Sequence, residues 1–336
     1  MAFKIVLYFK IFCTMYILLE ESEISRVLRN NILKSGEQMI GAIVITFNPN
    51  IEILTKNLHS IIQQVEYVLV VDNGSNNFPE FVDILRESKI KIINFEENLG
   101  IACALNEGMN YFKKKKFHWV LTLDQDSILP KHYIEKLTQL DEFQNNDTGI
   151  LGASYQDISR RENNSNDDIG VVDNPLLITS GGLTNIKAWQ TVGGFDERLF
   201  IDVVDHDFNQ RLIENNYRVL QAKNIVFYHN LGSPVNKPLL QTMLGIKKDF
   251  SPADHSEFRQ YYIYRNSIIF IKRYSTKPIW HIIILLTTLR ILFLFQNPLK
   301  KMKSALQGIR DGMNYSIRHD EFFKKYLKNK KAQEES

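Results

Sequence analysis

Two aspartates, Asp124 and Asp126, stand one residue apart directly after the strand-like stretch 120–123. That stretch has the character of a buried strand, so both carboxylates would emerge where the strand ends. Carboxylates this close repel each other unless a cation lies beside them. Hard divalent cations bind carboxylate oxygens and leave coordination positions for substrate phosphates. An isolated Asp-x-Asp is more often a helix cap or a solvated turn, so its interpretation depends on the elements around it.

The chain before Asp126 alternates between strands and helices. Apolar runs of strand length occupy 40–47, 66–75, 90–95 and 117–124, and helical spacing is present at 48–64 and 98–115. This alternation predicts βαβ units and an α/β fold, in which a largely parallel sheet has helices on both faces. Ligands of such sheets bind at the carboxyl ends of the strands. The unusual polar residues of the region fall at those ends: Asn48, Asp72, Asn73, Asn98, Asp124 and Asp126.

Two turns beside these strand ends favour a phosphate-bearing nucleoside as the ligand. Asp72 lies in VVDNGSNN, whose Gly-Ser-Asn residues form a tight turn that can wrap a nucleoside. Asn98 and Gly100 open a predicted helix, and the unpaired N–H groups of a helix start favour an anion.

A second acidic group lies in IDVVDHDFNQRL, which contains Asp202, Asp205 and Asp207 and ends shortly after Arg211. A spacing of two residues at a helix start puts Asp205 and Asp207 on different sides, so only one of them can point into a cleft. Acidic residues also stabilise a helix N-terminus by about 0.3–1 kcal/mol each, which would explain them without catalysis. Asp207 is placed to pair with Arg211 or with the backbone.

The composition is that of an ordinary globular protein, with 336 residues, 44% of them hydrophobic and 24% charged. A formal net charge of +3 is too small to indicate nucleic acid as the main partner. Lys and Arg gather towards the C-terminus beside aromatic and apolar segments at 257–274 and 278–295, so we expect an anionic membrane surface as a partner of this region. Neither segment has the uninterrupted apolar length of a transmembrane helix, so the two segments are either interfacial or a helical subdomain packed on the core. The two cysteines, Cys13 and Cys103, have neither disulfide-rich nor zinc-site spacing and indicate a reducing compartment.

We therefore predict three regions: an apolar N-terminal extension at 1–38, a catalytic α/β domain at 39–235, and a helical, basic and aromatic region at 236–336. The extension is short for a membrane span, Lys10 interrupts it, and no small-residue cleavage site follows it. It is either a helix that covers the core, a helix that lies on a membrane, or the product of a start codon upstream of the true one at Met39.

Six motifs follow one another in a distinctive order: IVITFNP, VVDNGSNN, NLGIACALNEGM, LTLDQDS, GGFDERLFIDVVDHDFNQRL and YHNLG. In this order they resemble the GT-A fold glycosyltransferases of family 2, most closely bacterial rhamnosyltransferases of surface polysaccharide biosynthesis. The resemblance covers roughly residues 40–315, including RQYYIYRN at 259–266. It implies a Rossmann-like, mostly parallel mixed sheet flanked by helices. It also implies inverting, metal-dependent transfer of a sugar, L-rhamnose from dTDP-L-rhamnose, to a saccharide or lipid-linked saccharide acceptor.

The resemblance implies a role for each matching residue. Asp72 would accept a hydrogen bond from the pyrimidine base, and Asp124 would meet the ribose hydroxyls directly or through the metal. Asp126 and His229 would hold Mg²⁺ or Mn²⁺ near the diphosphate, and Asp205 would be the general base. The remaining donor-binding residues would be Thr46, Pro49, Asn73, Ser75, Asn98, Gly100, Asn106, Ser180, Gly181 and Gly182.

The sequence departs from the family pattern before the base. Val204 stands where the family commonly has an acidic residue next to Asp205, so Asp202 competes for the role. Without the resemblance, a lone strand-end histidine such as His229 would be interpreted as structural. Trp189 and the GGF segment at 193–195 are expected on the acceptor side, although an aromatic residue at such a position is as often part of the core.

Other functions make different demands of the sequence. A haloacid-type phosphatase carries its Asp-x-Asp on the first strand, whereas here the motif ends the fourth and precedes Ser127. A dinucleotide oxidoreductase needs Gly-x-Gly-x-x-Gly at a helix start, and a processive synthase needs several membrane spans and Gln-x-x-Arg-Trp. A non-catalytic membrane scaffold that binds a sugar nucleotide stays open as an alternative. We expect a cytoplasmic protein, peripheral at the inner face of the plasma membrane.

Overall fold

The computed structural model describes residues 39–157, 170–229, 234–247 and 252–334. The architecture below is that of the compact unit Ile40–Ser336. The predicted extension at 1–38, with its three interpretations, lies outside the described residues.

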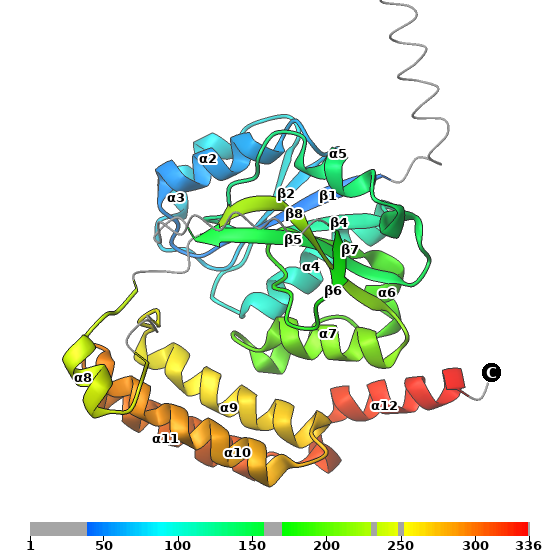
Figure 1. Ribbon diagram of the computed structural model, residues 1–336. Coiled ribbons are helices and arrows are strands. Elements are labelled where there is room, and N and C mark those ends of the chain that lie inside the picture. The colour runs from blue at the N-terminus through cyan, green and yellow to red at the C-terminus, as the bar shows by residue number, and fades with distance from the viewer. Residues whose placement is uncertain (1–38, 158–169, 230–233, 248–251, 335–336) are drawn as a thin grey trace, which may run out of the picture. The chain divides into compact units, whose positions relative to one another are not determined.

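Eight strands form one mixed sheet in the order β3-β2-β1-β4-β7-β5-β8-β6 (Figure 1). They are β1 (Ile40–Thr46), β2 (Val68–Asp72), β3 (Ile90–Asn94), β4 (Trp119–Asp124), β5 (Thr148–Asp157), β6 (Val171–Asp173), β7 (Gly182–Asn185) and β8 (Arg218–His229). β1 to β4 run parallel, and β7 is antiparallel to both β4 and β5, so β5 and β8 run in the direction of β4. The carboxyl ends of β1, β2, β4 and β8 therefore lie at one edge of the sheet.

Helices cover both faces of the sheet (Figure 1). One face carries α2 (Ile51–Ile61), α3 (Phe78–Phe81) and α5 (Tyr133–Thr138), and the other carries α4 (Ile101–Lys114), α6 (Ile186–Thr191) and α7 (Val204–Glu214). Alternate residues of β1 serve the two cores: Ala42 and Val44 join the first, and Ile43 and Ile45 join the second. The predicted α/β fold is confirmed, and its first four strands lie where the sequence predicts them.

Beyond β8 the described chain is mainly helical. Its helices are α8 (Pro238–Met243), α9 (Glu257–Tyr274), α10 (Pro278–Thr287), the 3₁₀ helix η4 (Thr288–Leu294), α11 (Pro298–Asn314), the 3₁₀ helix η5 (Ile317–His319) and α12 (Glu321–Glu334). α11 packs closely on α9 at Gly308. A Cβ atom at this position would lie only 2.2 Å from the carbonyl oxygen of Tyr261, so only a glycine allows the two helices to come this close. α9 also contributes Ile269 to the core beneath the sheet. Over the described ranges, no helix is both long and apolar enough to cross a bilayer.

Candidate active site

Asp124, Asp126 and His229 lie together at the carboxyl edge of the sheet. Asp124 ends β4 and His229 ends β8, and the turn after Asp124 reaches across to β8 because Ile128 pairs with Tyr228. One ligand atom from each of the three residues lies within 4.8 Å of the others. The Nε2 atom of His229 is 3.9 Å from Oδ2 of Asp124, and its Nδ1 atom is 3.6 Å from Oδ1 of Asp126. Two carboxylates and one imidazole are thus available to a single cation.

Two buried serines hold this cluster in place. The Oγ atom of Ser127 lies 2.9 Å from Nδ1 of His229 and 2.8 Å from Oγ of Ser180. Ser180 in turn accepts a hydrogen bond from the backbone N–H of Asp124 at 3.0 Å. Partners of this kind fix the ring and the tautomer of a metal-binding histidine. The structure shows Ser127 as a support of the histidine and Ser180 as a support of Ser127 and Asp124. The sequence analysis assigned no role to Ser127, and the predicted place of Ser180 in the donor pocket stays a prediction.

The electrostatics of the cluster favour a divalent cation. Burial raises the pKa of Asp124 to about 6, and the negative charges of Asp126 and Asp205 act in the same direction. The charge of His229 acts in the opposite direction and lowers this pKa. Burial also raises the pKa of Asp126 and the pKa of Asp205. Carboxylates crowded in this way are stabilised by an added positive charge. Carboxylate and imidazole ligands suit Mn²⁺ and, through the carboxylates, Mg²⁺, so the residues present fit the predicted metal.

Asp72 is fully buried beneath the turn that follows β2. Its Oδ1 atom accepts hydrogen bonds from the hydroxyls of Thr46 at 2.7 Å and Ser75 at 2.6 Å, and its Oδ2 atom accepts from the Ser75 N–H at 2.9 Å. The carbonyl of Pro49 accepts from the side-chain amide of Asn77 at 3.0 Å, which ties the β1 loop to the same turn. Asp72 therefore shapes the turn, and its contact with a base stays a prediction.

The predicted residues Asn73, after β2, and Asn98 and Gly100, after β3, join this turn to the start of α4. The side chain of Asn73 accepts from the Leu99 N–H at 2.9 Å, and that of Asn98 accepts from the Gly100 N–H at 2.9 Å. Gly100 has φ 89°, and a Cβ atom there would lie 2.8 Å from the ring of Phe200. A glycine is required at this position by both its backbone and its neighbour. The loops at the sheet edge thus form one connected rim.

Asn106 supports the rim from within the core. Its side-chain amide donates to the Phe195 carbonyl at 2.9 Å and to Glu197 at 2.8 Å, and its Oδ1 atom accepts from the indole N–H of Trp189 at 3.2 Å. Trp189 and Phe195 are buried. Their rings fill the core beneath the sheet, as the second interpretation of this stretch requires, and a part in shaping the acceptor side stays a prediction.

Gly181 and Gly182 are also buried. Gly181 has φ 79°, and a Cβ atom there would lie 2.5 Å from the ring of Phe227. A Cβ atom at Gly182 would lie 3.1 Å from the side chain of Ile150. Packing alone therefore requires small residues here, and a close approach to the donor sugar stays a prediction.

The three aspartates near the start of α7 have different surroundings. Asp202 forms a bidentate ion pair with Arg259. The Nε atom of Arg259 donates to Oδ2 of Asp202 at 3.2 Å, and its Nη2 atom donates to Oδ1. Asp207 is buried and paired with arginines. Asp205 accepts a hydrogen bond from the N–H of His206 at 2.9 Å and has no ion pair within the described ranges. This contrast favours Asp205 over Asp202 as the base, since its carboxylate is not committed to a cation.

The segment before α7 has a strained backbone. Phe200 (φ 64°, ψ −66°), Asp202 (φ 61°) and Val203 (φ 67°) all have positive φ angles. Such a conformation costs roughly 1–3 kcal/mol for a residue with a side chain, and a β-branched valine there is a clear outlier. It persists only where neighbouring residues hold it. Here it sets the direction of the first turn of α7, which carries Asp205.

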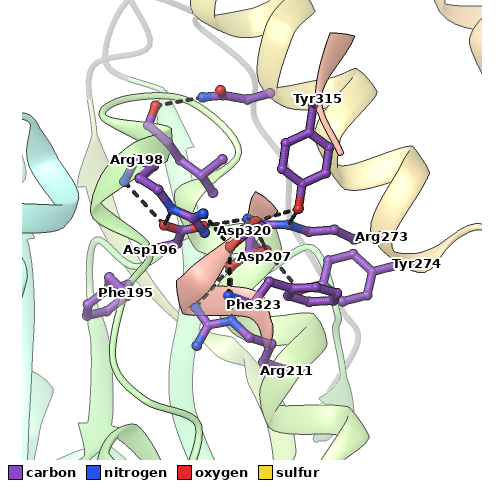
Figure 2. Close-up of polar contacts among 12 residues, drawn as sticks. Phe195, Asp196, Arg198, Asp207, Arg211, Arg273, Tyr274, Tyr315, Asp320 and Phe323 are labelled. Atoms are coloured by element: carbon purple, nitrogen blue, oxygen red, sulfur yellow. Dashed lines mark hydrogen bonds and ion pairs between the residues drawn. The ribbon is translucent and has the colours of Figure 1, made fainter. Parts of the chain in front are cut away.

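A buried network fixes α7 to the C-terminal helices (Figure 2). The guanidinium of Arg273 lies 2.7 Å from Asp196, 2.7 Å from Asp207 and 2.6 Å from Asp320, and each of these side chains is at most 1% exposed. Arg211 pairs with Asp207 at 2.9 Å, which confirms the predicted pairing. Although burial opposes ionisation, the charges of Arg211 and Arg273 hold the pKa of Asp207 below its usual value. No pattern in the sequence indicates that Arg273 or Asp320 belongs to this network.

Residues 42–200 match the family model described as glycosyl transferase family 2. Residues 42–200 are a family 2 glycosyltransferase domain. The transferase is also 27% identical over 297 residues to the dTDP-rhamnosyl transferase RfbF of Shigella flexneri, an alignment that covers 82% of this chain and 95% of that protein. The protein is therefore a glycosyltransferase, and the phosphatase and non-catalytic scaffold hypotheses are dropped.

Two solved structures resemble the transferase in fold. GalNAc-T7, crystallised with UDP, GalNAc and Mn²⁺, matches with a TM-score of 0.54 at 12% identity, over 87% of this chain and 56% of that one. TarS 1–349 of S. aureus matches with a TM-score of 0.47 at 15% identity, over 81% of this chain and 90% of that one. The likeness to GalNAc-T7 supports the predicted GT-A-like fold, and at this identity it speaks for the fold alone.

Proposed function

We propose that the transferase moves a sugar from a nucleoside diphosphate donor to a saccharide or lipid-linked saccharide acceptor in the synthesis of cell-surface polysaccharide. The observation that carries this proposal is the Asp205 carboxylate, which forms no ion pair within the described ranges. It lies near enough to the Asp124–Asp126–His229 cluster for its charge to raise the pKa of Asp124. Sugar transfer needs positive charge for the leaving diphosphate and a base for the acceptor hydroxyl. This edge of the sheet supplies residues for both.

The donor that we propose is dTDP-L-rhamnose. It is supported by the relative named a dTDP-rhamnosyl transferase, which aligns with this chain over 95% of its own length. Hydrogen bonds hold the turn around Asp72, Asn73 and Ser75 next to the ends of β1 and β2, where the base of the donor would bind. Asn98 and Gly100 would line the same pocket beside the start of α4.

The proposed reaction is a single displacement with inversion. The acceptor oxygen forms a bond to the anomeric carbon of the donor sugar from the face opposite the diphosphate. The bond between that carbon and the diphosphate oxygen breaks at the same time, and its electron pair leaves with the nucleoside diphosphate. Asp205 takes the proton of the acceptor hydroxyl, a contribution of about 10²–10⁴-fold for a positioned base.

Asp126 and His229 would hold Mg²⁺ or Mn²⁺ for this reaction, with Asp124 at the same ion or at the ribose hydroxyls. When bound, such an ion neutralises charge on the leaving diphosphate. Ser127 and Ser180 hold the imidazole and the end of β4 in place for it.

The function is tested by incubating the protein with a panel of sugar nucleotides and Mn²⁺ and following nucleoside diphosphate release. We expect release from dTDP-L-rhamnose, loss of it in Asp126→Ala, and a fall of about 10²–10⁴-fold in Asp205→Asn. Asp83→Asn is a matched control, because Asp83 pairs with Arg86 at the surface with 74% of its side chain exposed. Full release by both site variants would overturn the assignment, and release from a different sugar nucleotide would overturn the donor alone.

We further propose that the C-terminal region binds the cytoplasmic face of the plasma membrane, where a lipid-linked acceptor would be found. α10 has no buried residue, and Trp280 at 66% exposure and Ile279 at 73% stand among other exposed apolar side chains. Exposed Lys277 precedes α10, and exposed Lys300 lies in the first turn of α11. Exposed aromatic and aliphatic residues with flanking lysines favour the surface of an anionic bilayer.

Co-sedimentation with phosphatidylglycerol vesicles tests this binding. The double variant Trp280→Ser, Ile284→Ser should bind them less than the unaltered protein, whereas Leu176→Ser should not, although Leu176 is also 66% exposed. Equal sedimentation of all three proteins would contradict the membrane proposal. Point substitutions are preferable to deletion of 279–336, since that deletion removes Asp320 from Arg273.

A further inference from the structure

The face of α9 that meets the sheet domain contacts the strained segment before the catalytic aspartate. The side-chain amide of Asn266 donates to the backbone carbonyls of Leu199 at 2.7 Å, Ile201 at 2.8 Å and Asp202 at 3.0 Å. Asn266 is fully buried. One side chain therefore holds three carbonyls of 199–202, the stretch that joins the end of the 3₁₀ helix Glu197–Leu199 to the start of α7.

Other residues on this face of α9 contact the same segment. The ring of Tyr262 is stacked on the ring of Phe200, with centroids 5.1 Å apart and planes 17° apart. Arg259 pairs with Asp202. Arg259, Tyr262 and Asn266 are three and four residues apart, so they share one side of the helix. The positive φ angles of Phe200 and Asp202 are thus held from outside the segment.

The same helix also holds the chain just after Asp205. Arg273 and the hydroxyl of Tyr274 contact Asp207 at 2.7 Å and 2.8 Å. Asp205 lies between these two attachments. The direction of its side chain is therefore set through the backbone on either side of it.

We propose that Asn266 is a positioning residue for Asp205, acting through the carbonyls of 199–202 and the strained turn into α7. The proposal rests on the proposed role of Asp205 as the base. An asparagine meets the requirement because its amide nitrogen presents two N–H donors to a group of carbonyl oxygens. An aspartate at 266 would have nearly the same shape, but it would place oxygen atoms against those carbonyls.

The test is a double-mutant cycle of Asn266→Asp and Asp205→Asn, with dTDP release from dTDP-L-rhamnose in Mn²⁺ as the rate. A misplaced catalytic group can cost about 10²-fold, so we expect Asn266→Asp to lower kcat by roughly that factor. The KM for the donor and the Kd for dTDP with Mn²⁺ should change little, because the metal cluster lies on β4 and β8. In the Asp205→Asn background, Asn266→Asp should have almost no further effect. Tyr264→Phe is the control, since this buried α9 hydroxyl contacts Thr288 instead of the segment.

The outcomes separate the two levels of the proposal. Unchanged kcat in Asp205→Asn would refute the base assignment, whatever Asn266 does. A large loss in Asp205→Asn, with the same loss from Asn266→Asp in both backgrounds, would refute the positioning role alone. A parallel fall in dTDP affinity would refute it as well. If Asn266→Asp does not fold, Tyr262→Leu enters the same cycle with the same expectation, because Tyr262 is only partly buried.

Discussion

Replacement of Arg273 by methionine should destabilise the transferase strongly. The arginine carries three ion pairs to Asp196, Asp207 and Asp320, whose side chains are at most 1% exposed. Removing one partner from a buried pair leaves uncompensated charge and costs about 3–5 kcal/mol. For the roughly 300 residues of Ile40–Ser336, an unfolding entropy of about 2.1 cal/mol/K per residue converts this loss to a fall in Tm of about 5–8 °C.

The effect should also depend on pH in a defined direction. Folding lowers the pKa of Asp207 and the pKa of Asp320 from the ordinary value of 3.8, through their arginine partners and against the effect of burial. Carboxyls of this kind add stability above the unfolded pKa and lose it as the pH falls through the folded pKa. The difference between wild type and Arg273→Met should therefore be full at pH 7 and shrink below about pH 4.

Thermal unfolding by circular dichroism at several pH values measures both effects. Arg310→Met is the matched control, because Arg310 pairs with Asp311 at the surface with 68% of its side chain exposed. Exposed pairs contribute about 0–1 kcal/mol, so the control should shift Tm by less than about 2 °C. A fall in Tm of less than about 1 °C in Arg273→Met at pH 7, or a difference that persists unchanged to pH 3, would refute the reasoning.

Three further outcomes follow from the site. The kcat for transfer should fall as the pH drops through the raised pKa of Asp205, so its acid limb should lie above about pH 4; a flat profile down to that pH would contradict a carboxylate base. Ser127→Ala should weaken Mn²⁺ binding in calorimetry by about 10–100-fold, while the control Ser304→Ala on α11 should leave the affinity unchanged. Equal Mn²⁺ affinities of Ser127→Ala and the unaltered protein would contradict the role of Ser127 as a support of His229. Gly181→Ala should lower stability by roughly 1–3 kcal/mol, because its Cβ atom would lie 2.5 Å from the Phe227 ring, and an unaltered Tm would contradict that packing.

The sheet and its acidic edge could be predicted because both depend on local pattern. Continuous apolar runs identify buried strands, and the residue that ends a run marks the carboxyl edge of a parallel sheet. Asp124 and Asp72 could be placed in this way from spacing alone. His229 needed the family resemblance, because a single strand-end histidine carries no signal of its own. Its approach to Asp126 depends on the turn after β4 reaching past β7 and β5 to β8, which lies three strands from β4 in the sheet.

The supports of the site could not be predicted, because they join residues far apart in the chain. Arg273 and Asp196 are 77 residues apart in sequence, and Asn266 and Leu199 are 67 apart. Nothing in the pattern of α9 indicates which backbone carbonyls an asparagine will meet. The sequence left open whether the stretch at 257–274 lies on a membrane or packs on the core, and the structure shows α9 packed against the segment that precedes Asp205.

Binding of dTDP by calorimetry, with Mn²⁺ and with EDTA, tests the metal-and-base arrangement most directly. We predict that the unaltered protein binds dTDP only when Mn²⁺ is present and that Asp126→Ala loses this binding. Asp205→Asn should retain the affinity within about threefold, because that carboxylate serves the acceptor side. Equal binding in EDTA, or unchanged binding by Asp126→Ala, would contradict the account.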